Sequence, residues 1–137
     1  MSDPHNVLTT SEKNLCEYGA ALGVVLSVVC LVQHSVLVIP GPVTNPMIPA
    51  YFFFIITFIL LGLQKSFSVV LLIIGAGLSA VIEWLWTTHY SFSLVVLMLF
   101  FYHVVAIVVL FMQDIPKKLK LKKAAEKADK EIWADKI

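Results

Sequence analysis

The sequence predicts an all-α polytopic membrane protein with four transmembrane helices and a basic C-terminal helix. Three observations lead to this fold class. Apolar residues make up 59% of the 137 residues, and they form runs long enough to cross a bilayer. Short segments rich in proline or polar residues separate these runs. Eight of the ten lysines lie in the last 21 residues, so basic charge is concentrated after the last apolar run.

The first predicted transmembrane helix covers residues 16–39 and follows a short polar N-terminus, residues 1–15. The polar segment lacks the basic start of a signal peptide, so we expect the apolar run to be retained. One face of this helix carries a series of small residues that ends in an imidazole: Gly19, Gly23, Ser27, Cys30 and His34. Such a series favours close packing against another helix, in this chain or in another.

Four prolines in the segment PGPVTNPMIP, residues 40–49, prevent the first helix from continuing. Pro49 suits the first turn of a second helix over residues 49–64, where its missing N–H costs nothing. This second run is short and rich in phenylalanine. The brief polar turn that follows it makes the second and third helices antiparallel neighbours.

The third predicted helix, residues 66–88, carries one carboxylate within its apolar run. Glu83 shares a face with the small residues Gly75 and Ser79 at about 100° per residue. A charge that faces hydrocarbon costs several kcal/mol, so we expect this face to point into protein. The fourth predicted helix, residues 91–114, is bulkier and has His103 near its middle.

The tail, residues 115–137, is a predicted helix that carries eight lysines against four acidic residues. Leu121, Ala125, Ala128 and Ile132 can share one face of it. The tail could therefore lie on anionic lipid headgroups through a set of basic and aromatic side chains: Lys117, Lys118, Lys120, Lys122, Lys123 and Trp133. It could equally be a solvated helix that touches a partner subunit.

The lysine distribution also predicts the orientation in the membrane. Four spans put both termini on the same side as Lys65, whereas the two opposite loops contain no lysine. The positive-inside rule therefore places both termini in the cytoplasm of a multi-pass protein of the cell membrane.

Polar residues that fall within or beside the apolar runs are the candidate site: Gln33, His34, Glu83, His89 and His103. We expect a hydrogen bond between His34 and Glu83 that joins the first and third helices, because polar groups in lipid need partners. Metal binding by His34, Glu83 and His89 is an alternative, although no metal-ligand spacing motif supports it.

Two further alternatives involve His103. It could bind a haem together with His34, but their predicted depths differ by about 10 Å. It could also relay protons with Glu83. The sequence contains no CxxC pair, phosphate loop or nucleophile elbow, so we assign no catalytic residue and no bound metal or cofactor.

We therefore expect a non-catalytic accessory subunit of a larger membrane complex, whose partners are other integral membrane subunits and lipids rather than nucleic acid. A small metal- or haem-binding redox protein and a small proton-coupled transporter that uses Glu83 are the alternatives.

Three segments carry a resemblance to a known family: GAALGVVLS in the first helix, the connector PGPVTNPMIP, and the tail KKLKLKKAAEKADKE. Together with the chain length, they resemble the small extra subunit associated with archaeal ammonia monooxygenase, a copper membrane monooxygenase. The resemblance implies a three-subunit core with small helical subunits, often trimeric, in an archaeal cell membrane. It implies copper in the partner subunits, and no copper-ligand motif is carried over to this chain.

Overall fold

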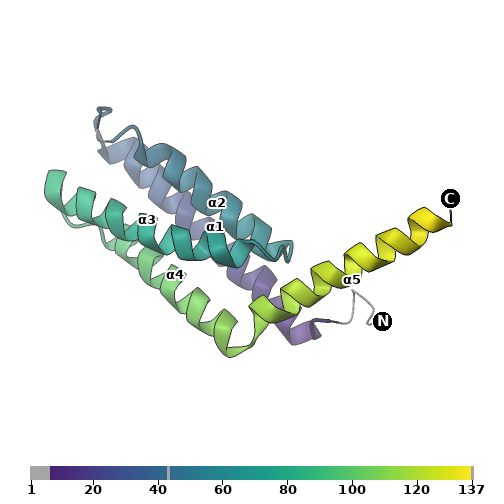
Figure 1. The fold of residues 1–137 in the computed structure, drawn as a ribbon. Helices are drawn as coiled ribbons and strands as arrows, with labels where there is room; N and C mark the ends of the chain where they lie inside the picture. Colours follow the sequence, from purple (N-terminus) through teal and green to yellow (C-terminus); the bar gives the residue numbers. More distant parts are fainter. Residues whose placement is uncertain (1–6, 43, 137) are drawn as a thin grey trace.

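The computed structural model describes residues 7–42 and 44–136. This part of the chain contains five helices and no strand, which confirms the predicted all-α class. The helices are α1 (Thr10–Leu37), α2 (Met47–Gly62), α3 (Ser68–His89), α4 (Leu94–Met112) and α5 (Ile115–Asp135). Helices α1 to α4 lie side by side in one bundle, and α5 turns away from the bundle (Figure 1).

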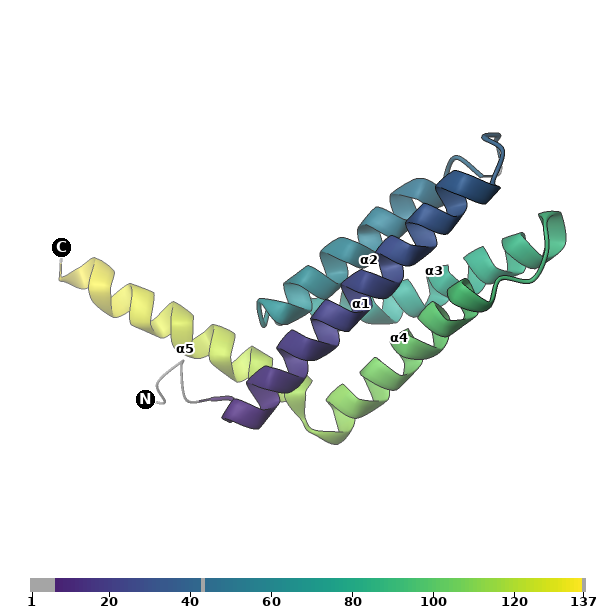
Figure 2. The same cartoon turned by 180° about the vertical axis from the view of Figure 1, so that it is seen from behind.

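The chain runs up and down through the bundle, and each helix packs against its neighbours in sequence. Helix α1 contacts α2 and α4, and α3 contacts the same two helices from the other side. One end of the bundle, here called the tail end, holds the start of α1, the α2–α3 turn and the start of α5 (Figures 1 and 2). The opposite end, here called the far end, holds the α1–α2 and α3–α4 connections.

Three helices are long and apolar enough to cross a membrane: α1, α3 and α4. Helix α2 is also apolar, but it has 16 residues and so spans only about 24 Å, against about 30 Å for a hydrocarbon core. The structure therefore has the features of a polytopic membrane protein, and three of the four predicted spans reach full length.

Large apolar side chains cover the outside of the bundle. Those that are more than half exposed occur on all four bundle helices and include Val25, Val32, Ile56, Val81, Phe101 and Val105. An apolar surface of this kind marks contact with lipid or with other proteins rather than with water.

The core is built around one aromatic face of α2. Tyr51, Phe54 and Phe58 are fully buried and follow one another at helical spacing. Phe58 packs directly against the α-carbon of Gly23, and Phe54 lies beside Gly75. The small residues of α1 and α3 therefore make room for the large rings of α2.

Helix α1 begins at Thr10, six residues before the start expected from hydropathy. The Thr9 hydroxyl accepts a hydrogen bond from the Glu12 amide, and the Glu12 carboxylate accepts one from the Thr9 amide. This capping box satisfies two donors at the helix start, so the polar segment can be helical as well.

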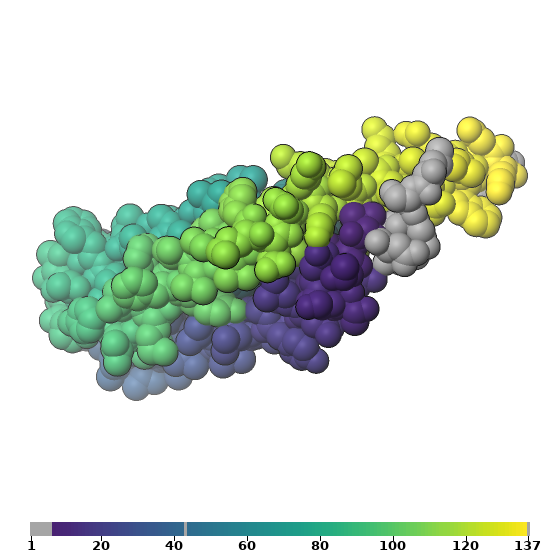
Figure 3. Space-filling model, turned by 90° about the horizontal axis from the view of Figure 1, so that it is seen from below, coloured from purple at the N-terminus to yellow at the C-terminus, as the bar shows by residue number. Residues whose placement is uncertain are grey.

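A sharp corner separates α4 from α5. Asp114 has a left-handed backbone with φ 55°, which ends α4 and changes the chain direction. Pro116 then lies in the first turn of α5, where the missing N–H removes no hydrogen bond. Beyond this corner α5 extends past the bundle, as the space-filling view shows (Figure 3).

Candidate functional site

Buried polar and aromatic side chains from three helices meet toward the far end of the bundle. The Trp86 indole donates a hydrogen bond to the Tyr51 hydroxyl, with 3.1 Å between the two atoms. The His34 imidazole is buried beside both rings, at centroid distances of 5.4 Å from Tyr51 and 6.3 Å from Trp86. This group joins α1, α2 and α3, and its members Tyr51 and Trp86 were not among the residues predicted for the site.

A second polar contact joins α1 to the start of α4. The Ser93 hydroxyl donates to the Gln33 side-chain oxygen at 2.9 Å and accepts from the Val96 amide at 3.3 Å. Ser93 is thus the N-cap of α4 and a partner of the predicted site residue Gln33.

The predicted hydrogen bond between His34 and Glu83 is not formed. Within the described part of the chain, neither Glu83 carboxylate oxygen nor the His34 Nδ1 has a hydrogen-bond partner, although these atoms are buried. The Thr87 hydroxyl, one turn away, donates to the Glu83 backbone carbonyl instead. The prediction was wrong because the aromatic rings of Tyr51 and Trp86 occupy the space next to His34.

His103 occupies a separate site, deeper in the bundle. Its Nδ1 lies 2.9 Å from the Leu99 carbonyl oxygen, and its ring packs between Phe54 and Phe58 at about 5 Å. A side-chain carbon added at Gly75 would come within 2.9 Å of the His103 Nε2. His103 therefore fills the small-residue face of α3, and its other ring nitrogen has no partner among the described residues.

The candidate metal ligands do not come together. His89 lies exposed at the end of α3, whereas His34 is buried on α1. No three histidine, cysteine, aspartate or glutamate side chains in residues 7–42 and 44–136 lie close enough to hold a metal ion. His34 packs on Tyr51 and His103 packs on Phe58, two rings at different levels of α2. The two histidines considered as haem ligands are therefore separated along the axis of that helix.

The predicted packing residues lie on faces of α1 and α3 that meet neighbouring helices of this bundle. Gly23 and Ser27 are buried, and Gly19 accepts a hydrogen bond at its carbonyl from the Tyr102 hydroxyl of α4. On α3, Gly75 and Ser79 are buried against neighbouring helices in the same way. Helices α2 and α4 therefore cover Gly23 and Ser27 within this chain, whereas Gly19 is only partly buried, and contact of the Gly19–Ser27 face with another chain stays a prediction.

The tail lysines divide into groups with different surroundings. Lys118 forms an ion pair with Glu12 at the start of α1, and Lys122 donates to the Gln64 side chain in the α2–α3 turn. Lys120 and Lys123 are exposed, as is Lys117 near the corner. Trp133 is exposed near the C-terminus, where the Lys136 ammonium lies over its ring at 5.1 Å.

No protein-family model, curated protein or solved structure matches this chain.

Proposed function

We propose that this chain is a non-catalytic accessory subunit of a larger membrane complex, anchored by its helix bundle and joined to a neighbouring subunit by α5. The exposed part of α5 is the observation that carries this proposal. Of its 21 residues, only Ile115 and Leu119 are buried. Beyond Leu119 no residue of α5 is buried, and the helix extends past the bundle (Figure 3).

The uncovered part of α5 carries an apolar stripe suited to a protein partner. Leu121 is 54% exposed and Ile132 is 38% exposed, and Ala125 and Ala128 lie between them on the same face. A helix without tertiary packing is only marginally stable in water. A partner that covers this stripe would add burial that residues 7–42 and 44–136 do not supply.

We further propose that all four bundle helices cross the membrane, with both termini in the cytoplasm. Helix α2 runs between α1 and α3 and carries exposed apolar residues such as Ile56. A short span is accommodated by local thinning of the bilayer at modest cost. The α5 lysines and Lys65 share the tail end, and the positive-inside rule favours the cytoplasm for such an end.

The identity of the complex is proposed from the sequence resemblance alone. It points to a membrane oxidoreductase of the ammonia monooxygenase type, in an archaeal cell membrane, with trimers of protomers. On this proposal copper is held by the partner subunits. The chain described here supplies packing surface and the α5 arm.

Native purification with substitutions in the apolar stripe tests the accessory role. A tagged chain with Leu121→Ser and Ile132→Ser is expected to lose the subunits that co-purify with the unmodified chain in mild detergent. Trp133→Ser is the matched control, because it removes an exposed apolar side chain from a different side of α5. Retention of every partner by the double variant, or a partner-free chain with its own turnover, would contradict the proposal.

A second candidate function, proton-coupled transport, is favoured by one observation. The Glu83 carboxylate is buried in α3 and has no hydrogen-bond partner within the described residues, and such groups often mark proton or ion pathways in membranes. Liposomes that contain only this chain should then show proton-coupled flux, and Glu83→Gln should abolish it. Absence of flux with the unmodified chain rejects this candidate.

A further inference from the structure

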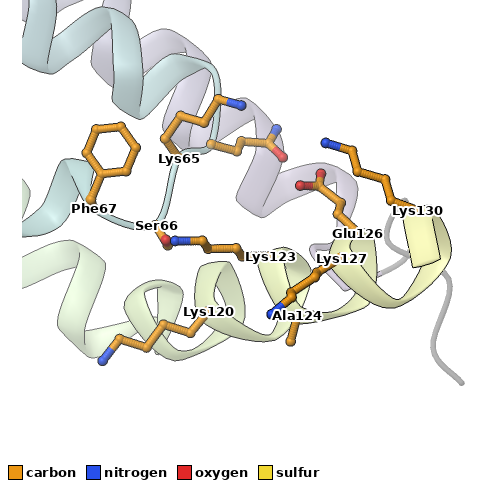
Figure 4. Close-up of a pocket in the computed structure, with 10 residues that line it drawn as sticks. Lys65, Ser66, Phe67, Lys120, Lys123, Ala124, Glu126, Lys127 and Lys130 are labelled. Carbon is orange, nitrogen blue, oxygen red and sulfur yellow. The ribbon is translucent and has the colours of Figure 1, made fainter. Parts of the chain in front are cut away.

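An open groove lies between α5 and the α2–α3 turn at the tail end of the bundle (Figure 4). Its volume is about 700 Å³, which leaves room for a phosphate group and its hydration, since a water molecule occupies about 30 Å³ in the liquid. Five lysines and one acidic residue supply the charge of its walls: Lys65, Lys120, Lys123, Lys127, Lys130 and Glu126.

The lysines of the groove come from two elements that are separated by more than fifty residues in sequence. Lys65 lies in the α2–α3 turn, and the other four are spaced 3, 4 and 3 residues apart on α5. That spacing puts them within about 80° of one another, on the face of α5 opposite the apolar stripe. The groove and the stripe are therefore separate surfaces of one helix.

Two contacts hold the groove in shape without using its lysines. Lys118 pairs with Glu12, and Lys122 donates to Gln64 next to Lys65. These contacts fix α5 against the start of α1 and against the turn. Across the described residues, no ion pair involves a lysine of the groove. Five cations with one acid between them repel one another, so an anion in the groove would relieve this repulsion.

The groove also has an apolar and a hydroxyl component. Phe67, which precedes α3, lines the groove and is 49% exposed, and Ser66 lies beside it. In Figure 4, Lys123 extends toward Ser66, and the Lys130 ammonium is drawn beside the Glu126 carboxylate. A ligand with a phosphate beside an acyl chain matches this order, with the phosphate at the lysines and the chain along Phe67.

We propose that this groove binds the phosphate of an anionic lipid headgroup at the membrane surface. Basic pockets beside transmembrane helices are suited to such headgroups, and the tail end is where the apolar helices stop. The inference rests on the membrane insertion proposed above but not on the accessory role. If no partner co-purifies with the chain, the lipid site is unaffected.

Native mass spectrometry of the full chain in neutral detergent tests the site. Phosphatidylglycerol and phosphatidylcholine with the same acyl chains are the probes, and the unmodified protein is expected to retain the first in preference. Lys65→Gln with Lys123→Gln removes one lysine from each wall. Each lysine is expected to contribute about fivefold to the affinity for the lipid. This double variant should therefore bind phosphatidylglycerol roughly 25-fold more weakly.

Lys117→Gln with Lys136→Gln is the matched control, because it removes the same charge from α5 outside the groove. An equal loss in the control would mean that net charge alone attracts the lipid and would overturn the proposal. Inorganic phosphate that binds as tightly as phosphatidylglycerol, or an acidic peptide that binds while the lipid does not, would overturn it as well. Circular dichroism confirms that each variant keeps its helices.

Discussion

Gly23 is the position where a single methyl group should matter most. A side-chain carbon built there would lie 2.3–2.5 Å from ring atoms of Phe58. That ring is fully buried and packs against Tyr102 and His103, so it has little freedom to move. Gly77, on the outer side of α3, has no atom within 4 Å of the same added carbon among the described residues. The two glycines differ only in their surroundings.

We predict that Gly23→Ala destabilises the bundle by about 1–3 kcal/mol, because overpacking outweighs the gain in helix propensity. Gly77→Ala should be neutral or stabilise the bundle by up to about 1 kcal/mol. Unfolding in detergent, followed by circular dichroism, measures both. A Gly23→Ala protein as stable as the Gly77→Ala protein would show that Phe58 is not held as the structure describes.

The hydrogen bond between Trp86 and Tyr51 gives a second residue-level prediction. A double-mutant cycle with Trp86→Phe and Tyr51→Phe should give a coupling free energy between about 0.6 kcal/mol, the average for polar contacts between membrane helices, and about 1.7 kcal/mol, the maximum. The cycle removes the packing loss that each substitution causes by itself.

The comparison cycle uses His34→Ala and Glu83→Ala, whose side chains share no hydrogen bond. Its coupling should be below about 0.5 kcal/mol. If the second cycle gave the larger coupling, the pair predicted from the sequence would be the correct one and the described aromatic contact would not dominate.

At the scale of elements, α5 depends on the first turn of α1. The Glu12 carboxylate caps α1 through the Thr9 amide and also pairs with Lys118. One side chain therefore stabilises a helix start and holds the tail helix against the bundle. The Lys118–Glu12 ion pair is part-buried and lies at the surface, where a single ion pair contributes up to about 1 kcal/mol, and the cap contributes about the same.

We predict that Glu12→Ala costs about 1 kcal/mol and increases hydrogen exchange at the first turn of α1. Spin labels on α1 and α5 should also report a broader distance distribution. Glu17→Ala is the control, since Glu17 is exposed on α1 and takes no part in the cap. Equal exchange in the two variants would argue against this dual role.

At the scale of the whole molecule, the exposure of residues in the connections between helices determines which of them can carry a reactive cysteine for labelling in a membrane. Thr44 in the α1–α2 connection is buried and donates to the Ile39 carbonyl, so it is a poor site for a reactive cysteine. Ser91, in the α3–α4 connection, is exposed at the same end of the bundle. Lys65 and Lys136 are exposed at or beyond the tail end.

We predict that a membrane-impermeant maleimide added outside cells labels Ser91→Cys but neither Lys65→Cys nor Lys136→Cys. The native Cys16 and Cys30 are buried, and serine replacements provide a background without them. All three sites should react once the membrane is permeabilised. Outside labelling of Lys136→Cys would contradict the orientation, and outside labelling of Lys65→Cys would contradict the α2 span.

Much of the architecture was predictable from local sequence. Long apolar runs are confined to helices because backbone groups in lipid must bond within their own segment. The prolines of residues 40–49 end α1, and the lysine-rich tail forms a separate helix. These features depend on residues close together in the chain. The additional helical turn at Thr10 was missed because its cap depends on the Thr9 and Glu12 side chains, whereas the predicted start followed hydropathy.

The tertiary structure decided which residues meet. Helical spacing put Gly23 and Gly75 on small-residue faces, but only the packing of the helices showed that Phe58 of α2 fills the first and His103 of α4 the second. His34 and Glu83 were expected to pair, yet His34 packs beside Tyr51 and Trp86. Lys65 lines a groove with α5 only because the corner at Asp114 turns the tail toward it. Periodicity determines the face on which a side chain lies, whereas the relative rotation and order of the helices determine what that face contacts.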